Sequence, residues 1–294
     1  MKHFSISDIE GLTGIKAHTI RIWEQRYDLF RPKRTNTNIR YYDDNDLCLF
    51  LNIATLNENG YKISKISKMN TDEIVDTVKN LQGDIQNVSS QSQALCNAMI
   101  KMDEREFEEV LDDCIIKLGL EETMTEILFP FLCKVGEMWQ VGTINPAHEH
   151  FATHKIAQKI IEATYAIKIN PKPDAKKFVL FLPPLEQHEL GLLFAQFLLR
   201  KYGHHCLYLG QNLPFETLAQ VISYYEPDFA FTVLTTALSN VNVENTLENL
   251  KKATPNVKLI ITGNLVANLN YQNTDLLLLI KSITSFTTFL SDNL

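Results

Sequence analysis

A histidine with a carboxylate two residues before it and a glycine three residues after it follows an apolar run. These residues are Glu186, His188 and Gly191, and the apolar run covers residues 178–183. An α/β domain binds ligands in the loops at the carboxyl ends of its strands, so this spacing places an imidazole at a ligand-binding edge. An imidazole can bind a metal, and a neighbouring carboxylate can orient its second ring nitrogen. Taken alone, the loop is more typical of a solvated surface turn.

The segments around this loop alternate between strand-like and helical patterns. We expect strands at residues 178–182, 206–209, 229–234, 259–262 and 276–280, and helices at 190–202, 215–225, 241–252, 265–269 and 283–292. Five such units predict a doubly wound parallel five-stranded sheet of the Rossmann-like (flavodoxin-like) kind. Neither GxGxxG nor GxxxxGK[ST] occurs, so the sequence supports neither a dinucleotide site nor a nucleoside triphosphate site.

Composition indicates a soluble, multidomain protein with both α and α/β domains. The chain has 294 residues, of which 45% are hydrophobic and 21% charged, enough for two or three domains. Its five cysteines are far apart and form no CxxC pair, which argues against disulfide, zinc and iron–sulfur sites. No apolar run is long enough to span a bilayer, so we expect a cytoplasmic protein without a membrane partner.

Charge is distributed unevenly. The net charge is -7, but residues 1–70 carry about +3 and the remainder about -10. We therefore expect nucleic-acid contact only in the first segment, whose pattern predicts a winged helix-turn-helix. A short helix ends at Thr13-Gly14, a second helix covers residues 16–27 with Trp23 inward, and a basic turn at 31–42 suits a wing.

Residues 3–70 closely resemble the DNA-binding domain of the MerR family. The resemblance rests on the run from Thr13 to Tyr27, the wing ending in Arg40-Tyr41-Tyr42, and the acidic helix start after it. It implies a second helix in the major groove, a wing on the DNA backbone, and a dimer on a palindromic operator. The implied DNA-contacting residues are His18, Thr19, Arg21, Arg26, Arg40 and Tyr41.

The pattern predicts four domains or segments along the chain. They are the DNA-binding domain at 1–83, a polar linker at 84–93, a four-helix bundle at 94–170 and the sheet domain at 171–294. The bundle helices are expected at 94–102, 105–118, 120–138 and 146–167. His150 and His154 share a helix face, so a metal site is conceivable, but no third ligand is indicated.

Trp139, nine residues and then Glu149-His150 resemble the helical cap of cobalamin-binding photoreceptor regulators of the CarH and LitR type. The resemblance implies that the tryptophan covers the upper face of the corrin ring, beside the adenosyl group. The alternative is an interface tryptophan with solvated neighbours. Gln140 departs from the pattern, because the light-sensing relatives have a histidine directly after the tryptophan.

The opening motif also resembles the cobalamin-binding pattern Asp-x-His-x-x-Gly, then Ser-x-Leu, then Gly-Gly. Here Glu186-x-His188-x-x-Gly191 is followed after forty residues by Thr232-x-Leu234 and after twenty-eight more by Gly263-Asn264. The resemblance implies that His188 is the lower cobalt ligand, that Glu186 orients it, and that the glycines and Thr232 accommodate the nucleotide tail. Three residue types depart from the pattern, at positions 186, 232 and 264.

Together these resemblances predict a light-responsive transcriptional regulator. The implied cofactor is adenosylcobalamin, which would set the oligomeric state, dimer or tetramer, and hence operator affinity, with a dark-state repressor. One alternative is a MerR-type regulator whose C-terminal domain has lost the cofactor and senses a protein partner. Another is a cobalamin-dependent enzyme, which is disfavoured because no domain is left to hold a substrate.

Overall fold

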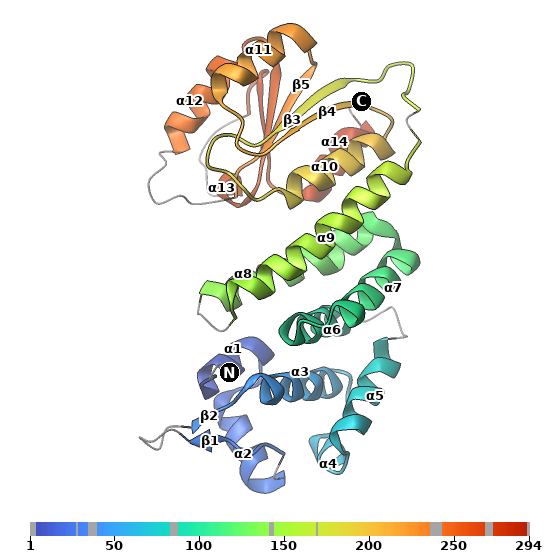
Figure 1. Cartoon of the computed structure of the whole chain (residues 1–294), viewed down its shortest axis with the longest axis vertical. Helices are drawn as coiled ribbons and strands as arrows, with labels where there is room; N and C mark the ends of the chain where they lie inside the picture. Colours follow the sequence, from blue (N-terminus) through green and yellow to red (C-terminus); the bar gives the residue numbers. More distant parts are fainter. Residues whose placement is uncertain are drawn as a thin grey trace. The chain divides into compact units, whose positions relative to one another are not determined.

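The computed structural model describes residues 4–27, 29–34, 40–82, 88–140, 144–168, 170–235, 243–267 and 273–292. The chain divides into two compact units, Met1–Lys155 and Ile156–Leu294 (Figure 1). The boundary falls inside one helix, α9. Among the described helices, none has both the length and the apolar composition to cross a membrane.

The first unit begins with the predicted winged helix-turn-helix. Its elements are α1 (Ile6–Thr13), α2 (Ala17–Tyr27), β1 (Lys33–Arg34), β2 (Arg40–Tyr41), α3 (Asp44–Glu58), α4 (Ile63–Ile66) and α5 (Thr71–Gln82). Ser5 and Asp8 form a capping box that starts α1, and Gly14 ends it in the left-handed conformation that glycine adopts readily. Strands β1 and β2 pair antiparallel as the wing, and residues 35–39 between them lie outside the described part.

The rest of the first unit is helical. Its elements are α6 (Val88–Lys101), α7 (Glu104–Glu122), the π-helix η1 (Thr123–Leu128), α8 (Phe129–Gln140) and α9 (Pro146–Ala166), the last of which continues into the second unit. The predicted break at Gly119 is present, because its φ of 79° and ψ of 159° are not helical. The π-helix was not expected from the sequence.

The predicted polar linker at 84–93 is wrong in its second half, because α6 already begins at Val88, whereas residues 83–87 lie outside the described part. Its polar side chains face inward: Ser90, Gln91 and Gln93 are buried. Helix α6 also packs against α3, where Asn97 Nδ2 donates a buried hydrogen bond to Asn52 Oδ1 (2.6 Å). The helices after the DNA-binding segment are therefore docked on it within one unit.

The second unit holds the predicted sheet. Its strands are β3 (Lys177–Phe181), β4 (His205–Gly210), β5 (Phe229–Val233), β6 (Lys258–Thr262) and β7 (Leu277–Ile280), all parallel and in the order β4-β3-β5-β6-β7. Its further helices are α10 (Leu190–Lys201), α11 (Phe215–Tyr225), α12 (Val243–Ala253), α13 (Asn264–Ala267) and α14 (Ile283–Asp292). The order reverses between β3 and β5, and ligands of such sheets bind at this switch point.

Alternate residues of the strands fill two cores. Val179 and Phe181 of β3 pack with Leu218 of α11 and Leu247 of α12 on one face. On the other face, Phe231 of β5 contacts Phe286 of α14, with 4.9 Å between ring centroids. Figure 1 shows α11 and α12 on one side of the sheet and α10 and α14 on the other. Burial on both faces explains why the strands read as nearly continuous apolar runs.

Candidate functional site

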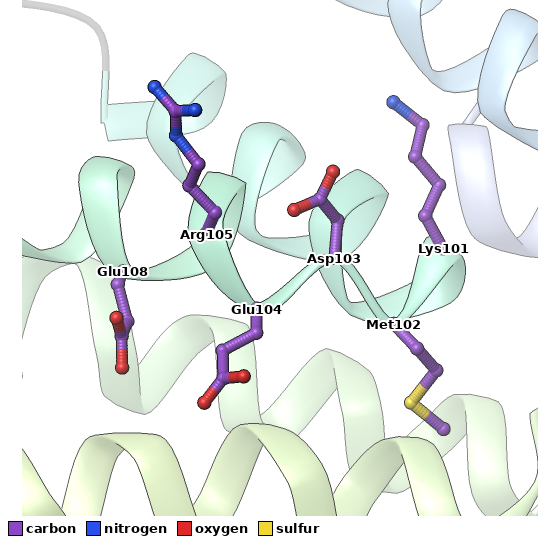
Figure 2. A pocket seen from close by; sticks show the side chains of 6 residues that line it. All are labelled: Lys101, Met102, Asp103, Glu104, Arg105 and Glu108. Atoms are coloured by element: carbon purple, nitrogen blue, oxygen red, sulfur yellow. The ribbon is translucent and has the colours of Figure 1, made fainter.

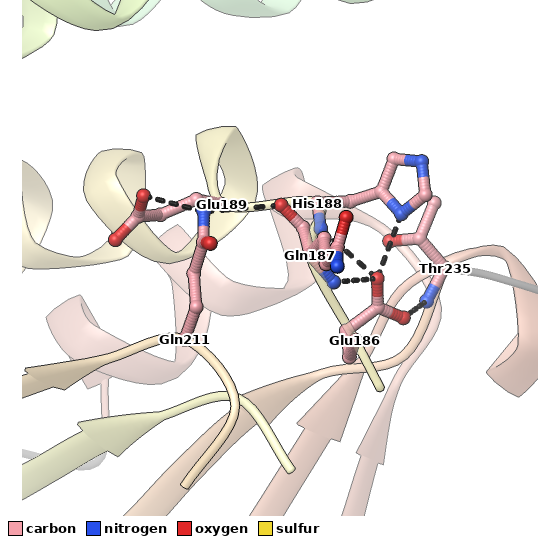
Figure 3. Close-up of polar contacts among 6 residues, drawn as sticks. All are labelled: Glu186, Gln187, His188, Glu189, Gln211 and Thr235. Atoms are coloured by element: carbon pink, nitrogen blue, oxygen red, sulfur yellow. Dashed lines mark hydrogen bonds and ion pairs between the residues drawn. The ribbon is translucent and has the colours of Figure 1, made fainter. Parts of the chain in front are cut away.

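Glu186 organises the loop after β3. This residue is only 3% exposed. Its Oε1 accepts from the backbone N–H of Gln187 and of His188 (both 3.0 Å) and lies 2.7 Å from His188 Nδ1, while Oε2 accepts from the backbone N–H of Thr235 (2.8 Å). Figure 3 shows this fan of contacts around one carboxylate. The buried charge is therefore supported by donors from two loops, those that follow β3 and β5.

The same contacts determine the orientation of the imidazole. An ionised carboxylate only accepts hydrogen bonds, so Nδ1 of His188 carries the hydrogen in its bond to Glu186. In the neutral ring the lone pair is then on Nε2, which Figure 3 shows on the side of the ring away from Glu186. The His188 side chain is 58% exposed. A metal ligand supported by a buried carboxylate has this arrangement.

A second carboxylate, not singled out from the sequence, fixes the other side of the loop. Glu189 accepts from Tyr208 Oη (2.7 Å) and from Gln211 Nε2 (2.7 Å), and Gln211 Nε2 also donates to the carbonyl of Gln187 (3.2 Å). Burial, and then the bond to Glu189, raises the pKa of Tyr208 above its usual value. The partners lie about twenty positions away on β4 and its loop, so local spacing carried no signal for them.

The ends of β5 and β6 form the floor beside this loop. Thr232 is fully buried, and its Oγ1 has no hydrogen-bond partner within the described residues. Gly263 has a φ of 110°, and a Cβ at this position would overlap the carbonyl oxygen of Leu234. Leu234 is buried, whereas Asn264 is exposed at the start of α13. The orphaned hydroxyl fits a ligand that brings its own polar group, and this is how the predicted nucleotide tail would be accommodated.

Gly191 lies in the first turn of α10 against β5. A Cβ there would lie 3.4 Å from Val233 Cγ1 and Cγ2, at van der Waals contact, so this turn of α10 lies directly against the end of β5. The structure therefore brings together Glu186, His188, Gly191 and Thr232 at the carboxyl edge of the sheet, with Leu234 and Gly263 beside them.

The predicted cap residues belong to the first unit. Trp139 near the end of α8 is 55% exposed, which is unusual for so large an apolar side chain. Glu149 on α9 accepts from Thr153 Oγ1 (2.7 Å), and its other oxygen lies 3.9 Å from His150 Nδ1. The side chain of Gln140 lies outside the described part. No group of three or more His, Cys, Asp or Glu suited to a metal ion occurs among the described residues.

Helix α2 presents the predicted DNA-contacting face. His18, Arg21 and Arg26 are exposed at helical spacing, while Thr19 is half-buried with its Oγ1 3.4 Å from His18 Nε2. Trp23 is 6% exposed, which confirms the prediction that it belongs to the core. The exposed cations suit contact with phosphates and base edges in a groove.

The wing is tied to this helix by Glu24. Arg40 Nε lies 3.8 Å from Glu24 Oε2, and the buried Tyr42 hydroxyl donates to Glu24 Oε1. Burial, and then this bond, raises the pKa of Tyr42 above its usual value. Tyr41 of β2 is half-buried. Part of the Arg40 side chain thus holds the wing against α2, a structural role that its sequence position did not reveal.

A separate pocket of about 620 Å³ lies at the turn between α6 and α7. Figure 2 shows its charged lining, which includes Lys101, Asp103 and Arg105. Its cations are paired with acids of α7: Lys101 at the end of α6 with Glu106 at 3.3 Å, and Arg105 with Glu109 one turn further along α7 at 2.7 Å. None of the predicted site residues lines this pocket.

Comparisons with known proteins support both the DNA-binding and the cobalamin-binding parts of the sequence interpretation. Residues 4–72 match the family model for the MerR HTH family regulatory protein, and residues 91–162, on helices α6 to α9, match the B12 binding domain. The chain is 28% identical over 262 residues to the HTH-type transcriptional repressor CarH of Myxococcus xanthus, which covers 86% of this chain and 85% of CarH. The HTH-type transcriptional repressor CarA of the same organism is 25% identical over 261 residues, which covers 88% and 85%. Among solved structures, the Methanosarcina barkeri monomethylamine corrinoid protein covers 67% of this chain and 95% of that chain, with 12% identity and a TM-score of 0.49.

Proposed function

We propose that the protein is a cytoplasmic sensor of adenosylcobalamin that represses transcription in the dark. The chain is a CarH/CarA-like transcriptional regulator with a MerR-type DNA-binding domain and a B12-binding domain, and not an enzyme. The residues proposed to contact DNA are His18, Thr19, Arg21 and Arg26 on α2, together with Arg40 and Tyr41 of the wing.

The geometry of Glu186 and His188 carries the proposal. The hydrogen bond at 2.7 Å holds the imidazole with Nε2 away from the carboxylate, as a lower cobalt ligand requires. When bound, the cofactor would supply a cobalt centre and a cobalt–carbon bond that light can break. Glu186 would orient this ligand, and the hydrogen bond from Thr235 keeps Glu186 in place.

The remaining cofactor contacts are proposed by resemblance and fit. Thr232 offers a buried hydroxyl without a partner among the described residues to the nucleotide tail, and Gly191, Leu234, Gly263 and Asn264 surround its path. Trp139, Glu149 and His150 are proposed contacts on the upper side of the corrin. The large exposed surface of Trp139 supports this role, because a planar aromatic ring is well suited to cover a planar ligand.

Regulation requires that the cofactor bind one assembly more tightly than another. A ligand with equal affinity for two states shifts neither, so adenosylcobalamin must favour the oligomer that binds the operator. We propose that this oligomer, dimer or tetramer, occupies a palindromic operator in the dark. Light would then weaken DNA binding by removing the adenosyl group that distinguishes the two states.

The decisive experiment is an absorbance spectrum of the full chain mixed with adenosylcobalamin in the dark, desalted, and read before and after green illumination. Retained corrin absorbance supports the cofactor, and the loss of a ligated spectrum in His188→Ala supports the lower ligand. DNA retardation and the elution volume are then compared between dark and illuminated samples. A colourless desalted protein that still binds DNA would refute cobalamin sensing and favour a domain that senses a protein partner.

A further inference from the structure

A tight turn precedes the site loop. Residues 183–186 form it, and the backbone N–H of Glu186 donates to the carbonyl of Pro183 (3.2 Å). Leu185, the third residue of the turn, has a φ of 72°. With a trans proline at the second position, this is a type II turn, whose third position favours glycine or asparagine because other side chains are strained there.

The left-handed conformation of Leu185 is held from a second loop. Its backbone N–H donates to Asn212 Oδ1 (3.0 Å), and Asn212 follows β4 with a positive φ of its own, 56°. Strained residues persist when the surrounding structure determines their conformation, and they concentrate at functional sites. The turn and the bond from Asn212 together therefore hold Leu185 in the left-handed conformation.

Leucine is an unexpected residue at this position for a second reason. Its side chain is 61% exposed, whereas Glu186 directly after it is 3% exposed. One exposed leucine is ordinary in a protein surface. An exposed leucine in a strained conformation adds nothing to the core and makes the turn less favourable. Glycine or asparagine would remove both the backbone strain and the exposed apolar side chain. Within residues 185–189 it is also the single apolar side chain.

We propose that Leu185 is a further cofactor-contact residue, whose apolar side chain packs against the corrin when His188 binds cobalt. The inference rests on the proposed function. Small-molecule sites combine a few oriented polar groups with an apolar surface. The loop supplies the polar groups through Glu186 and His188, and Leu185 supplies the apolar contact that the loop otherwise lacks.

The test compares the dissociation constant for adenosylcobalamin, measured in the dark on the full chain, for the wild type, Leu185→Gly, Leu185→Asn and Leu185→Met. Glycine and asparagine suit the turn but lack the apolar group, so each should weaken binding roughly tenfold. Methionine keeps the apolar volume and should bind within about twofold of the wild type. Leu276→Asn, at an exposed leucine next to β7, is the matched control and should bind like the wild type.

A second measurement separates contact from folding. The unfolding midpoint of the cofactor-free protein should stay the same or rise in Leu185→Gly, because glycine relieves the strain. A lower midpoint would show that Leu185 serves stability, and it would overturn the proposal. If Leu185→Gly and Leu185→Asn bind adenosylcobalamin as tightly as the wild type, the proposal is overturned while cobalamin sensing is left intact. No binding by the wild type would overturn both.

Discussion

Replacing Glu186 by Gln tests how the loop after β3, which carries Glu186 and His188, is organised, with the smallest possible change in shape. The carboxylate accepts three hydrogen bonds at Oε1 and one, from Thr235, at Oε2. An amide has one oxygen and one NH2 group. If the oxygen remains with Gln187 and His188, the NH2 group faces the N–H of Thr235, and two donors oppose each other.

The magnitude follows from these bonds. Each bond that changes from charged to neutral loses about 1 kcal/mol, and the unpaired, partly buried N–H of Thr235 costs about 1–3 kcal/mol. Removing a buried charge returns part of this, because the desolvation of an ion costs several kcal/mol. We expect a net loss of about 2–3 kcal/mol in the free energy of unfolding of the cofactor-free protein, and roughly 10–100-fold weaker cobalamin binding.

The assay is urea unfolding of the cofactor-free chain, followed by cobalamin titration in the dark. Glu189→Gln is the matched control, because it makes the same chemical change on the same loop and Glu189 bonds Tyr208 and Gln211. It should alter cobalamin affinity by less than about threefold, since it leaves the carboxylate that orients His188 in place. If Glu186→Gln unfolds at the wild-type urea concentration and binds cobalamin equally well, the carboxylate neither supports the loop nor orients the histidine.

Three further predictions concern other parts of the chain. Arg21→Ala should weaken operator binding roughly tenfold and lower the salt dependence in retardation assays, whereas Lys252→Ala on α12 should change neither; equal effects would remove α2 from the interface. Asn97→Leu should destabilise the protein by about 1–3 kcal/mol, because Asn52 loses its buried partner. Replacing both Asn97 and Asn52 by leucine should recover part of this loss in a double-mutant cycle measured by urea unfolding. Additive effects of the two replacements would show that the residues are not coupled. Burial, and then Lys172, lowers the pKa of His204 from its ordinary 6.5, so the unfolded chain binds the extra proton and stability falls as the pH drops below about 6.5. Unfolding between pH 7.5 and 5 should show a shallower pH dependence in His204→Gln, and an unchanged slope would assign the effect to other groups.

Much of the fold was accessible from the sequence because its signals are local. Strand β3 and the histidine loop after it are adjacent in the chain, and an apolar run followed by Glu186, His188 and Gly191 describes both. The prediction of a parallel five-stranded sheet is confirmed, since alternation of strands and helices leaves few other topologies. The helix-turn-helix is also confirmed. Its signals are local too, because a capping box begins α1 and a turn glycine ends it.

The parts that escaped prediction depend on contacts between distant residues. The polar composition of residues 84–93 indicated a linker, but Ser90, Gln91 and Gln93 are buried in α6, where tertiary packing overrides composition. The contacts of Glu189 come from another strand and its loop, and no periodicity reports them. The left-handed conformation of Leu185 was not predicted either: Pro183-Pro184 marks a turn, but the hydrogen bond that holds Leu185 there comes from the distant Asn212.

Gly263 and Asn264 are neighbours with opposite freedom to change during evolution. Any side chain at Gly263 would overlap the Leu234 carbonyl, so substitution there must separate the ends of β5 and β6. Asn264 is exposed and meets no such limit. The departure from the Gly-Gly pattern, which lies at Asn264, therefore falls on the permissive member of the pair. In a mutational scan, tolerance should rise abruptly from position 263 to 264, and a natural variant with a side chain at 263 would identify a lineage in which this edge of the sheet has been rebuilt.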